Sequence, residues 1–86
     1  MKLDFTDITV KQVLHSCYDN ENRDPPYEGY CSENERKIMN KLAEMGLITV
    51  LLPNNTKSLN HYAIRFTDKG RATFLENGKM LDCYCL

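Results

Sequence analysis

The stretch from Ser32 to Gly70 constrains the fold of this 86-residue chain more than any other part. It holds, in order, an amphipathic helix with an N-terminal cap, a Gly-Leu-Ile exit, two strand-like segments around a polar tip, and another capped helix. Ser32 and Glu35 have the spacing of a capping box, and Gly46 suits the left-handed residue that ends a helix. The sequence therefore predicts a helix over 32–45, followed by an antiparallel hairpin.

The hairpin is predicted from two runs of strand-forming residues. Ile48–Leu52 and His61–Phe66 are rich in β-branched and aromatic side chains, which favour strands. In the second run, apolar residues alternate with Arg65, as expected for a strand with one buried face. Pro53–Asn60 between them is polar and breaks the strand pattern. We expect it to form the tip of the hairpin.

A last helix is predicted after the hairpin, capped by Thr67 or Asp68 and continuing through Leu75 until Asn77-Gly78 stops it. The segment that follows, residues 79–86, is unusually apolar for a terminus. It must either pack back on the domain or bury itself in a partner, for example at a dimer interface.

An earlier helix is predicted over Val10–Tyr18, with Thr9 and Gln12 as a capping box. Its apolar residues recur at helical spacing and form one stripe for the core: Val10, Val13, Leu14, Cys17 and Tyr18. Leu3 and Phe5 precede it and are expected either to cover the core or to add a short strand.

The segment Asp19–Cys31 is polar and holds two adjacent prolines, which predicts a loop with at most one helical turn. Three of its side chains, Tyr27, Tyr30 and Cys31, are expected to anchor the loop on the core. The alternative for the two tyrosines, which lie between acidic residues, is a protein-contact surface.

Length and composition predict one small α+β domain spanning residues 1–86, mainly helical with a small antiparallel hairpin. The beginning of the chain lacks the apolar core of a signal peptide, and no apolar run is long enough to span a bilayer. We therefore expect a cytoplasmic protein without a membrane association.

The chain has four cysteines, Cys17, Cys31, Cys83 and Cys85. We expect them to be reduced thiols that bind no metal. The alternatives are a structural zinc site and a disulfide-linked dimer through the end of the chain.

Charge is unevenly distributed along the chain, although the formal net charge is only −1. Residues 1–35 contain three basic and eight acidic side chains, whereas residues 36–71 contain seven basic and two acidic ones. Such a division suggests that this nearly neutral protein has one basic face, which could engage phosphates. This requires the basic residues of 36–71 to lie together in the folded chain.

Together, the 32–45 helix, the Gly46-Leu47-Ile48 exit, the hairpin and Phe66-Thr67-Asp68-Lys69-Gly70 resemble a winged helix-turn-helix domain. The resemblance is to the small MarR-like and PadR-like regulators of bacteria, archaea and phages. It implies that helix 32–45 is a recognition helix for the major groove of DNA. It also implies that residues 53–60 are a wing that touches the DNA backbone or the minor groove.

This resemblance predicts a small DNA-binding transcriptional regulator, dimeric through its first helix and its apolar tail. Arginine and asparagine can contact base edges, and lysine neutralises phosphates. The candidate DNA-binding residues are Arg36, Lys37, Asn40, Lys41, Lys57, Arg65, Lys69 and Arg71. The alternative for the helix is a solvated face on which Glu33–Lys37 and Lys41–Glu44 pair with each other.

A second hypothesis is a winged-helix module that binds protein, such as a phage-encoded inhibitor or adaptor of a host complex. The acidic first third of the chain and a predicted wing with Lys57 as its one basic residue favour it. The candidate contact residues are Tyr27, Tyr30 and Tyr84. No catalytic residues and no cofactor are predicted, because the catalytic residue types present (His15, Cys17, Cys31 and His61) fall into no known constellation.

Overall fold

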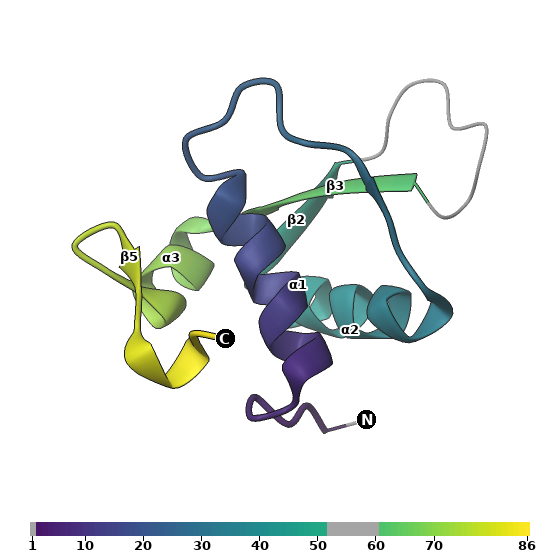
Figure 1. Ribbon diagram of the computed structural model, residues 1–86, viewed down its shortest axis with the longest axis horizontal. Helices are drawn as coiled ribbons and strands as arrows, with labels where there is room; N and C mark the ends of the chain where they lie inside the picture. Colours follow the sequence, from purple (N-terminus) through teal and green to yellow (C-terminus); the bar gives the residue numbers. More distant parts are fainter. Residues whose placement is uncertain (1, 52–60) are drawn as a thin grey trace.

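Three α-helices and two small antiparallel sheets make up the part of the chain that the computed structural model describes, residues 2–51 and 61–86 (Figure 1). The helices are α1 (Ile8–Asp19), α2 (Glu33–Glu44) and α3 (Asp68–Phe74). One sheet has the order β1-β3-β2, from β1 (Gly29–Tyr30), β2 (Ile48–Leu51) and β3 (His61–Phe66). The other pairs β4 (Leu75–Glu76) with β5 (Lys79–Met80), and a 3₁₀ turn, η1 (Asp82–Tyr84), follows. The predicted mixed α+β class is confirmed.

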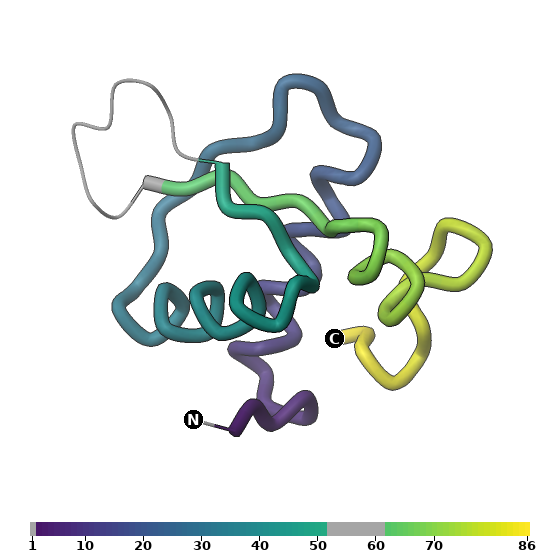
Figure 2. The backbone as a smooth tube through the Cα atoms, turned by 180° about the vertical axis from the view of Figure 1, so that it is seen from behind, coloured from purple at the N-terminus to yellow at the C-terminus, as the bar shows by residue number. Residues whose placement is uncertain are grey.

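The core lies where α1 and α2 pack against each other and α1 packs on β3. Seen from behind, α2 and β2 lie in front of α1 (Figure 2). Helix α1 contributes Val10, Val13, Leu14 and Cys17, which are the predicted stripe without the half-buried Tyr18. Helix α2 contributes Ile38, Met39 and Leu42. Burying each large aliphatic side chain contributes roughly 1.5–3 kcal/mol before entropy is counted.

Helix α1 begins at Ile8, two residues earlier than expected, and its cap is Asp7. The Asp7 carboxylate accepts a hydrogen bond from the Thr9 backbone N–H at 3.0 Å, so the predicted capping box of Thr9 and Gln12 was wrong. A carboxylate also interacts favourably with the positive end of the helix dipole, which a threonine hydroxyl does not. Leu3 and Phe5 pack against the core and form no strand.

Helix α2 forms as its sequence predicts. The Ser32 hydroxyl accepts from the Glu35 N–H at 3.2 Å, and the Glu35 carboxylate accepts from the Ser32 N–H at 3.3 Å. At the other end Gly46 has a φ of +76°, and the Leu47 N–H donates to the Leu42 carbonyl at 3.0 Å. Leu47 is buried, which completes the hydrophobic contact of this type of helix end.

The turn from α2 into β2 is held by the start of α3. The Thr67 N–H donates to the Leu47 carbonyl at 3.1 Å, and the Thr67 hydroxyl donates to the Gly46 carbonyl at 2.6 Å. The same hydroxyl accepts from the Gly70 N–H at 3.0 Å, which makes Thr67 the cap of α3. A Cβ on Gly70 would lie 2.0 Å from the Leu47 carbonyl oxygen, so this close approach requires glycine. We call these contacts the α2–α3 junction.

Helix α3 ends at Phe74, so its predicted extension to Leu75 was wrong, as was the role of Asn77-Gly78 as a helix stop. Leu75 pairs with Met80 in a short hairpin, and Asn77 (φ 54°) and Gly78 (φ 79°) form its turn. Asn-Gly is the favoured sequence for a two-residue turn with two positive φ angles. Hairpin formation buries Met80.

The apolar tail packs back on its own domain. The half-buried Tyr84 ring meets Phe74 edge-on, with ring centroids 4.9 Å apart, and lies 6.0 Å from Phe5. Phe66 stacks on Phe74 at 5.6 Å, and such aromatic pairs are stabilising beyond the area they bury. Tyr84 is therefore part of an internal aromatic cluster and lies apart from the other two candidate contact tyrosines.

The segment between α1 and α2 is mostly loop, as predicted, but it contains the short strand β1, which pairs with the beginning of β3. Cys31 is buried, whereas Tyr27 and Tyr30 are 62% and 71% exposed. The expectation that both tyrosines anchor the loop on the core was therefore wrong. Tyr30 lies on β1, an edge strand of the sheet, where one face of the strand reaches solvent.

Asn20 anchors the loop instead, and it is the polar residue buried in the described core, at 3% exposure. Its amide nitrogen donates to the Ile64 carbonyl of β3 at 2.9 Å, and its amide oxygen accepts from the Tyr27 N–H at 2.8 Å. The β1–β3 pairing begins at Gly29↔Tyr62, and Asn20 bridges the two backbones just before it. Its side chain thus satisfies the Ile64 carbonyl and the Tyr27 N–H, which would otherwise be unpaired.

Candidate nucleic-acid interface

The outer face of α2 brings together polar and basic side chains. Lys37, Asn40, Lys41 and Glu44 line one open depression, because residues three, four and seven apart lie on the same side of a helix. The opposite side of α2 is buried through Ile38, Met39 and Leu42. We call the face formed by Lys37, Asn40 and Lys41 the α2 face.

The charges of the α2 face are only weakly neutralised within the helix. Lys37 lies 3.9 Å from the Glu33 carboxylate, and both side chains are largely exposed, so the predicted pair is confirmed but contributes little. Asn40 is exposed, whereas Lys41 and Arg36 are half-buried. A half-buried lysine keeps its apolar stem on the protein and its ammonium in water.

Lys69 extends this basic character to the end of α2. Its ammonium donates to the carbonyl of Met45, the C-cap residue, at 3.0 Å, one helical turn beyond Lys41. A cation at this position also interacts favourably with the negative end of the helix dipole. The structure therefore places Lys69 beside the α2 face, although it lies on α3.

Arg65 and Arg71 are not part of the α2 face, because both bind the loop that follows α1. Arg71 Nε donates to both carboxylate oxygens of Glu21 at 2.9 Å, and Arg71 Nη1 donates to Asp68 at 2.6 Å. The Glu21 carboxylate raises the pKa of the Arg71 guanidinium. Arg65 Nη2 donates to the Arg23 carbonyl at 2.7 Å and lies 3.8 Å from the Asp24 carboxylate. In Figure 1 the first part of this loop lies at the top of the view, and α2 lies in the lower half.

The predicted wing, Pro53–Asn60, and its Lys57 lie outside the described residues. The strands that lead into it and out of it, β2 and β3, are paired from Ile48↔Phe66 to Leu51↔Ala63. Of the eight candidate DNA-binding residues, the structure therefore groups Arg36, Lys37, Asn40, Lys41 and Lys69 on or beside α2, and places Arg65 and Arg71 elsewhere.

The cysteines form no disulfide. Cys17 and Cys31 are buried, Cys85 is half-buried and Cys83 is exposed. Burial raises the pKa of the Cys17 thiol well above its usual range, so this thiol stays protonated. In the ranges 2–51 and 61–86, no three or more His, Cys, Asp and Glu side chains form a cluster suited to a metal ion.

No helix of the described residues is both long enough and apolar enough to cross a membrane. Comparison with protein families, with curated proteins and with solved structures finds no match to this chain.

Proposed function

We propose that this chain is a small DNA-binding regulator of the winged helix-turn-helix type, with α2 as the helix that enters the major groove. The observation that carries the proposal is the α2 face, on which Lys37, Asn40 and Lys41 line one depression while the opposite side of α2 is buried. A major groove admits one α-helix, and this helix presents donors on its outward side.

The way α2 is held supports the same proposal. In the winged helix-turn-helix family that the sequence resembles, a short helix precedes the recognition helix; this chain departs from that pattern, since the described residues between α1 and α2 contain the two-residue strand β1. The position of α2 is instead maintained by its packing on α1 and by the α2–α3 junction. A recognition helix needs such rigid support, because base contacts demand precise placement of side chains.

The chemistry of each side chain assigns it a different role at DNA. Lys37, Lys41 and Lys69 would neutralise phosphates, whereas Asn40 would read adenine through its amide and Arg36 guanine through its guanidinium. The formal net charge of −1 predicts weak non-specific affinity, since long-range attraction to the DNA is small. Because each lysine that neutralises a phosphate displaces bound counterions, binding should weaken as salt is raised.

Fluorescence anisotropy with a labelled mixed-sequence duplex, at increasing salt, tests the proposal. The double variant Lys37→Gln/Lys41→Gln removes two phosphate contacts and should reduce the magnitude of the negative slope of log K against log salt by about 1.8. The matched control Lys79→Gln removes an exposed lysine on β5 and should leave the slope unchanged. If the wild-type chain has no detectable affinity even at low salt, the proposal is wrong.

A protein-binding module is the second candidate, and the exposure of Tyr27 and Tyr30 favours it. Exposed tyrosines give large contact area at low entropic cost, and the adjacent Glu28 would repel DNA. Capture of a partner that persists after nuclease treatment, and that is lost in Tyr27→Ser/Tyr30→Ser, would favour this function. A partner that disappears with nuclease would favour DNA.

A homodimer remains part of the DNA-binding proposal, but it would have to use surfaces other than those first expected. The apolar stripe of α1 and the aromatic side chain of the tail lie in the core of one chain. What these elements leave exposed includes Ile8 and Leu86, which line one small pocket with Thr6, Lys11 and Cys85.

A further inference from the structure

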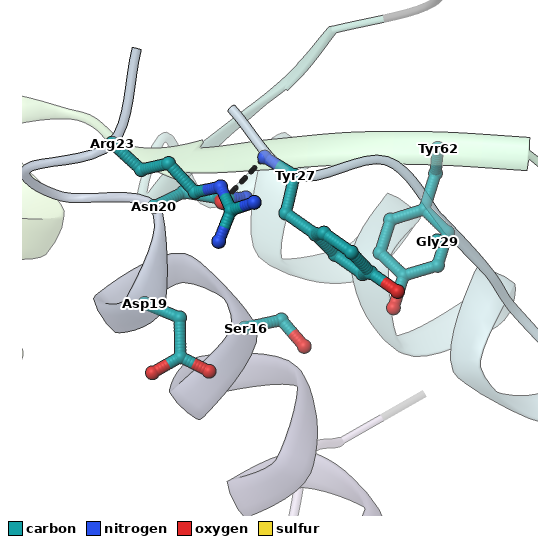
Figure 3. Close-up of a pocket in the computed structure, with 7 residues that line it drawn as sticks. All are labelled: Ser16, Asp19, Asn20, Arg23, Tyr27, Gly29 and Tyr62. Atoms are coloured by element: carbon teal, nitrogen blue, oxygen red, sulfur yellow. Dashed lines mark hydrogen bonds between the residues drawn. The ribbon is translucent and has the colours of Figure 1, made fainter. Parts of the chain in front are cut away.

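A cavity of about 470 Å³ lies between the end of α1, the loop after it and β3, away from the α2 face. Figure 3 shows Arg23 on one side of it, Asp19 and Ser16 on another, and the rings of Tyr27 and Tyr62 together on a third. The volume is within the range of small-molecule sites, roughly 300–1,000 Å³. Neither proposed function uses this cavity as a ligand site.

Two opposite charges, Asp19 and Arg23, border the cavity without an ion-pair partner among the described residues. The ion pairs formed by residues 2–51 and 61–86 include neither Asp19 nor Arg23, although both side chains line the same cavity. The Arg23 guanidinium instead lies over the Tyr27 ring, 5.2 Å from its centroid. A ligand that carries one anionic and one cationic group would complement both side chains at once.

The rest of the wall is aromatic. Tyr62 is half-buried, and burial raises the pKa of its phenol. Gly29 lies beside both rings: a Cβ there would be 3.5 Å from Tyr27 Cε1 and 3.8 Å from Tyr62 Cε1, in ordinary van der Waals contact. The two rings provide an apolar surface next to the charged groups.

The cavity is built before any ligand arrives, because its rim is tied to β3 at two points. Asn20 joins the Tyr27 N–H to the Ile64 carbonyl, and Arg65 Nη2 holds the Arg23 carbonyl at 2.7 Å. Fixing a loop in its binding conformation lowers the entropy lost on binding. These contacts therefore lower the entropic cost of binding a small ligand in the cavity.

We propose that this cavity binds a free α-amino acid with an aromatic or aliphatic side chain. The Arg23 guanidinium pairs with the α-carboxylate, the Asp19 carboxylate pairs with the α-ammonium, and the ligand side chain packs against Tyr27 and Tyr62. A peptide terminus carries only one of the two charges, so it satisfies only one of the two protein groups.

Nuclear magnetic resonance titration of the ¹⁵N-labelled full chain with L-phenylalanine tests this proposal. At about 10 mM ligand, even a millimolar Kd gives nearly complete saturation. We expect saturable shifts centred on residues 16–29 and Tyr62. N-acetyl-L-phenylalanine and L-phenylalanine amide each lack one charge and should bind at least roughly tenfold more weakly.

The variants Asp19→Asn and Arg23→Gln should each weaken L-phenylalanine binding by roughly tenfold, and their own spectra report whether they fold. Asp82→Asn, which alters an exposed carboxylate on η1, is the matched control and should bind like the wild type. Absence of saturable shifts would overturn the proposal. Equal binding of the amino acid and either derivative, or unchanged binding in both variants, would overturn it as well.

Discussion

At the scale of single residues, two residues determine whether the loop after α1 and the α2–α3 junction keep their places. Asn20 replaces a missing strand neighbour of β3, and Gly70 allows the start of α3 to approach the Leu47 carbonyl. Each effect depends on a close contact between two segments that are remote in sequence. Substitutions at these residues should therefore change stability more than their size suggests.

Asn20→Ala should destabilise the chain by about 2 kcal/mol, because it leaves the Ile64 carbonyl and the Tyr27 N–H without their partner. Urea unfolding measures this difference. Asn22→Ala is the matched control, since Asn22 is exposed in the same loop and should change stability by no more than about 0.5 kcal/mol. Equal effects of the two variants would contradict the anchoring role of Asn20.

Gly70→Ala should cost about 3 kcal/mol or more, because the new methyl group would meet the Leu47 backbone. Gly78→Ala has open space around its Cβ but a φ of +79°, so it should cost only about 1 kcal/mol. Thermal or urea unfolding of both variants distinguishes the cost of a steric clash at Gly70 from the cost of backbone strain at Gly78. If Gly70→Ala is the milder change, the close approach described above is incorrect.

The cysteines should differ sharply in reactivity. Burial raises the pKa of the Cys17 thiol, so little thiolate forms there at about pH 8, while Cys83 is exposed. Cys83 should react first with a disulfide reagent such as DTNB, and Cys17 only after denaturant is added. Mass spectrometry of the labelled peptides checks the order, and early labelling of Cys17 would contradict it.

At the scale of elements, the α2–α3 junction gives the clearest prediction. Thr67→Val removes the hydroxyl that bonds to both the Gly46 carbonyl and the Gly70 N–H, and it should cost about 1–2 kcal/mol. Thr73→Val in the same helix removes a hydroxyl that bonds only to the Lys69 carbonyl and should cost less than about 0.5 kcal/mol. Comparable losses would show that Thr67 is not a junction residue.

The elements also show which parts of the fold can be predicted from local sequence patterns. Helix α2, its cap and its glycine exit were predictable, because each signal lies within a few residues of its effect. Asn77-Gly78 was ambiguous, since the same dipeptide suits both a helix end and a hairpin turn. The pairing of Leu75 with Met80 selects the hairpin turn. Local sequence propensities do not predict this pairing.

At the scale of the whole molecule, the basic half of the sequence does not become one basic face. Lys37, Lys41 and Lys69 gather on or beside α2, whereas Arg71 binds Glu21, which lies 50 residues away in sequence. Counting charges along the chain cannot detect such a pairing, because it depends on the acidic loop folding back onto α3. The candidate site is therefore smaller than the sequence predicted.

The central claim is that α2 is the element that meets DNA, and residue-resolved titration of the ¹⁵N-labelled chain with a duplex tests it most directly. The account predicts that, at low salt, amide shifts concentrate on residues 36–45 and around Lys69 and disappear as salt is raised. Shifts that concentrate instead on residues 20–30, with α2 unaffected, would contradict it.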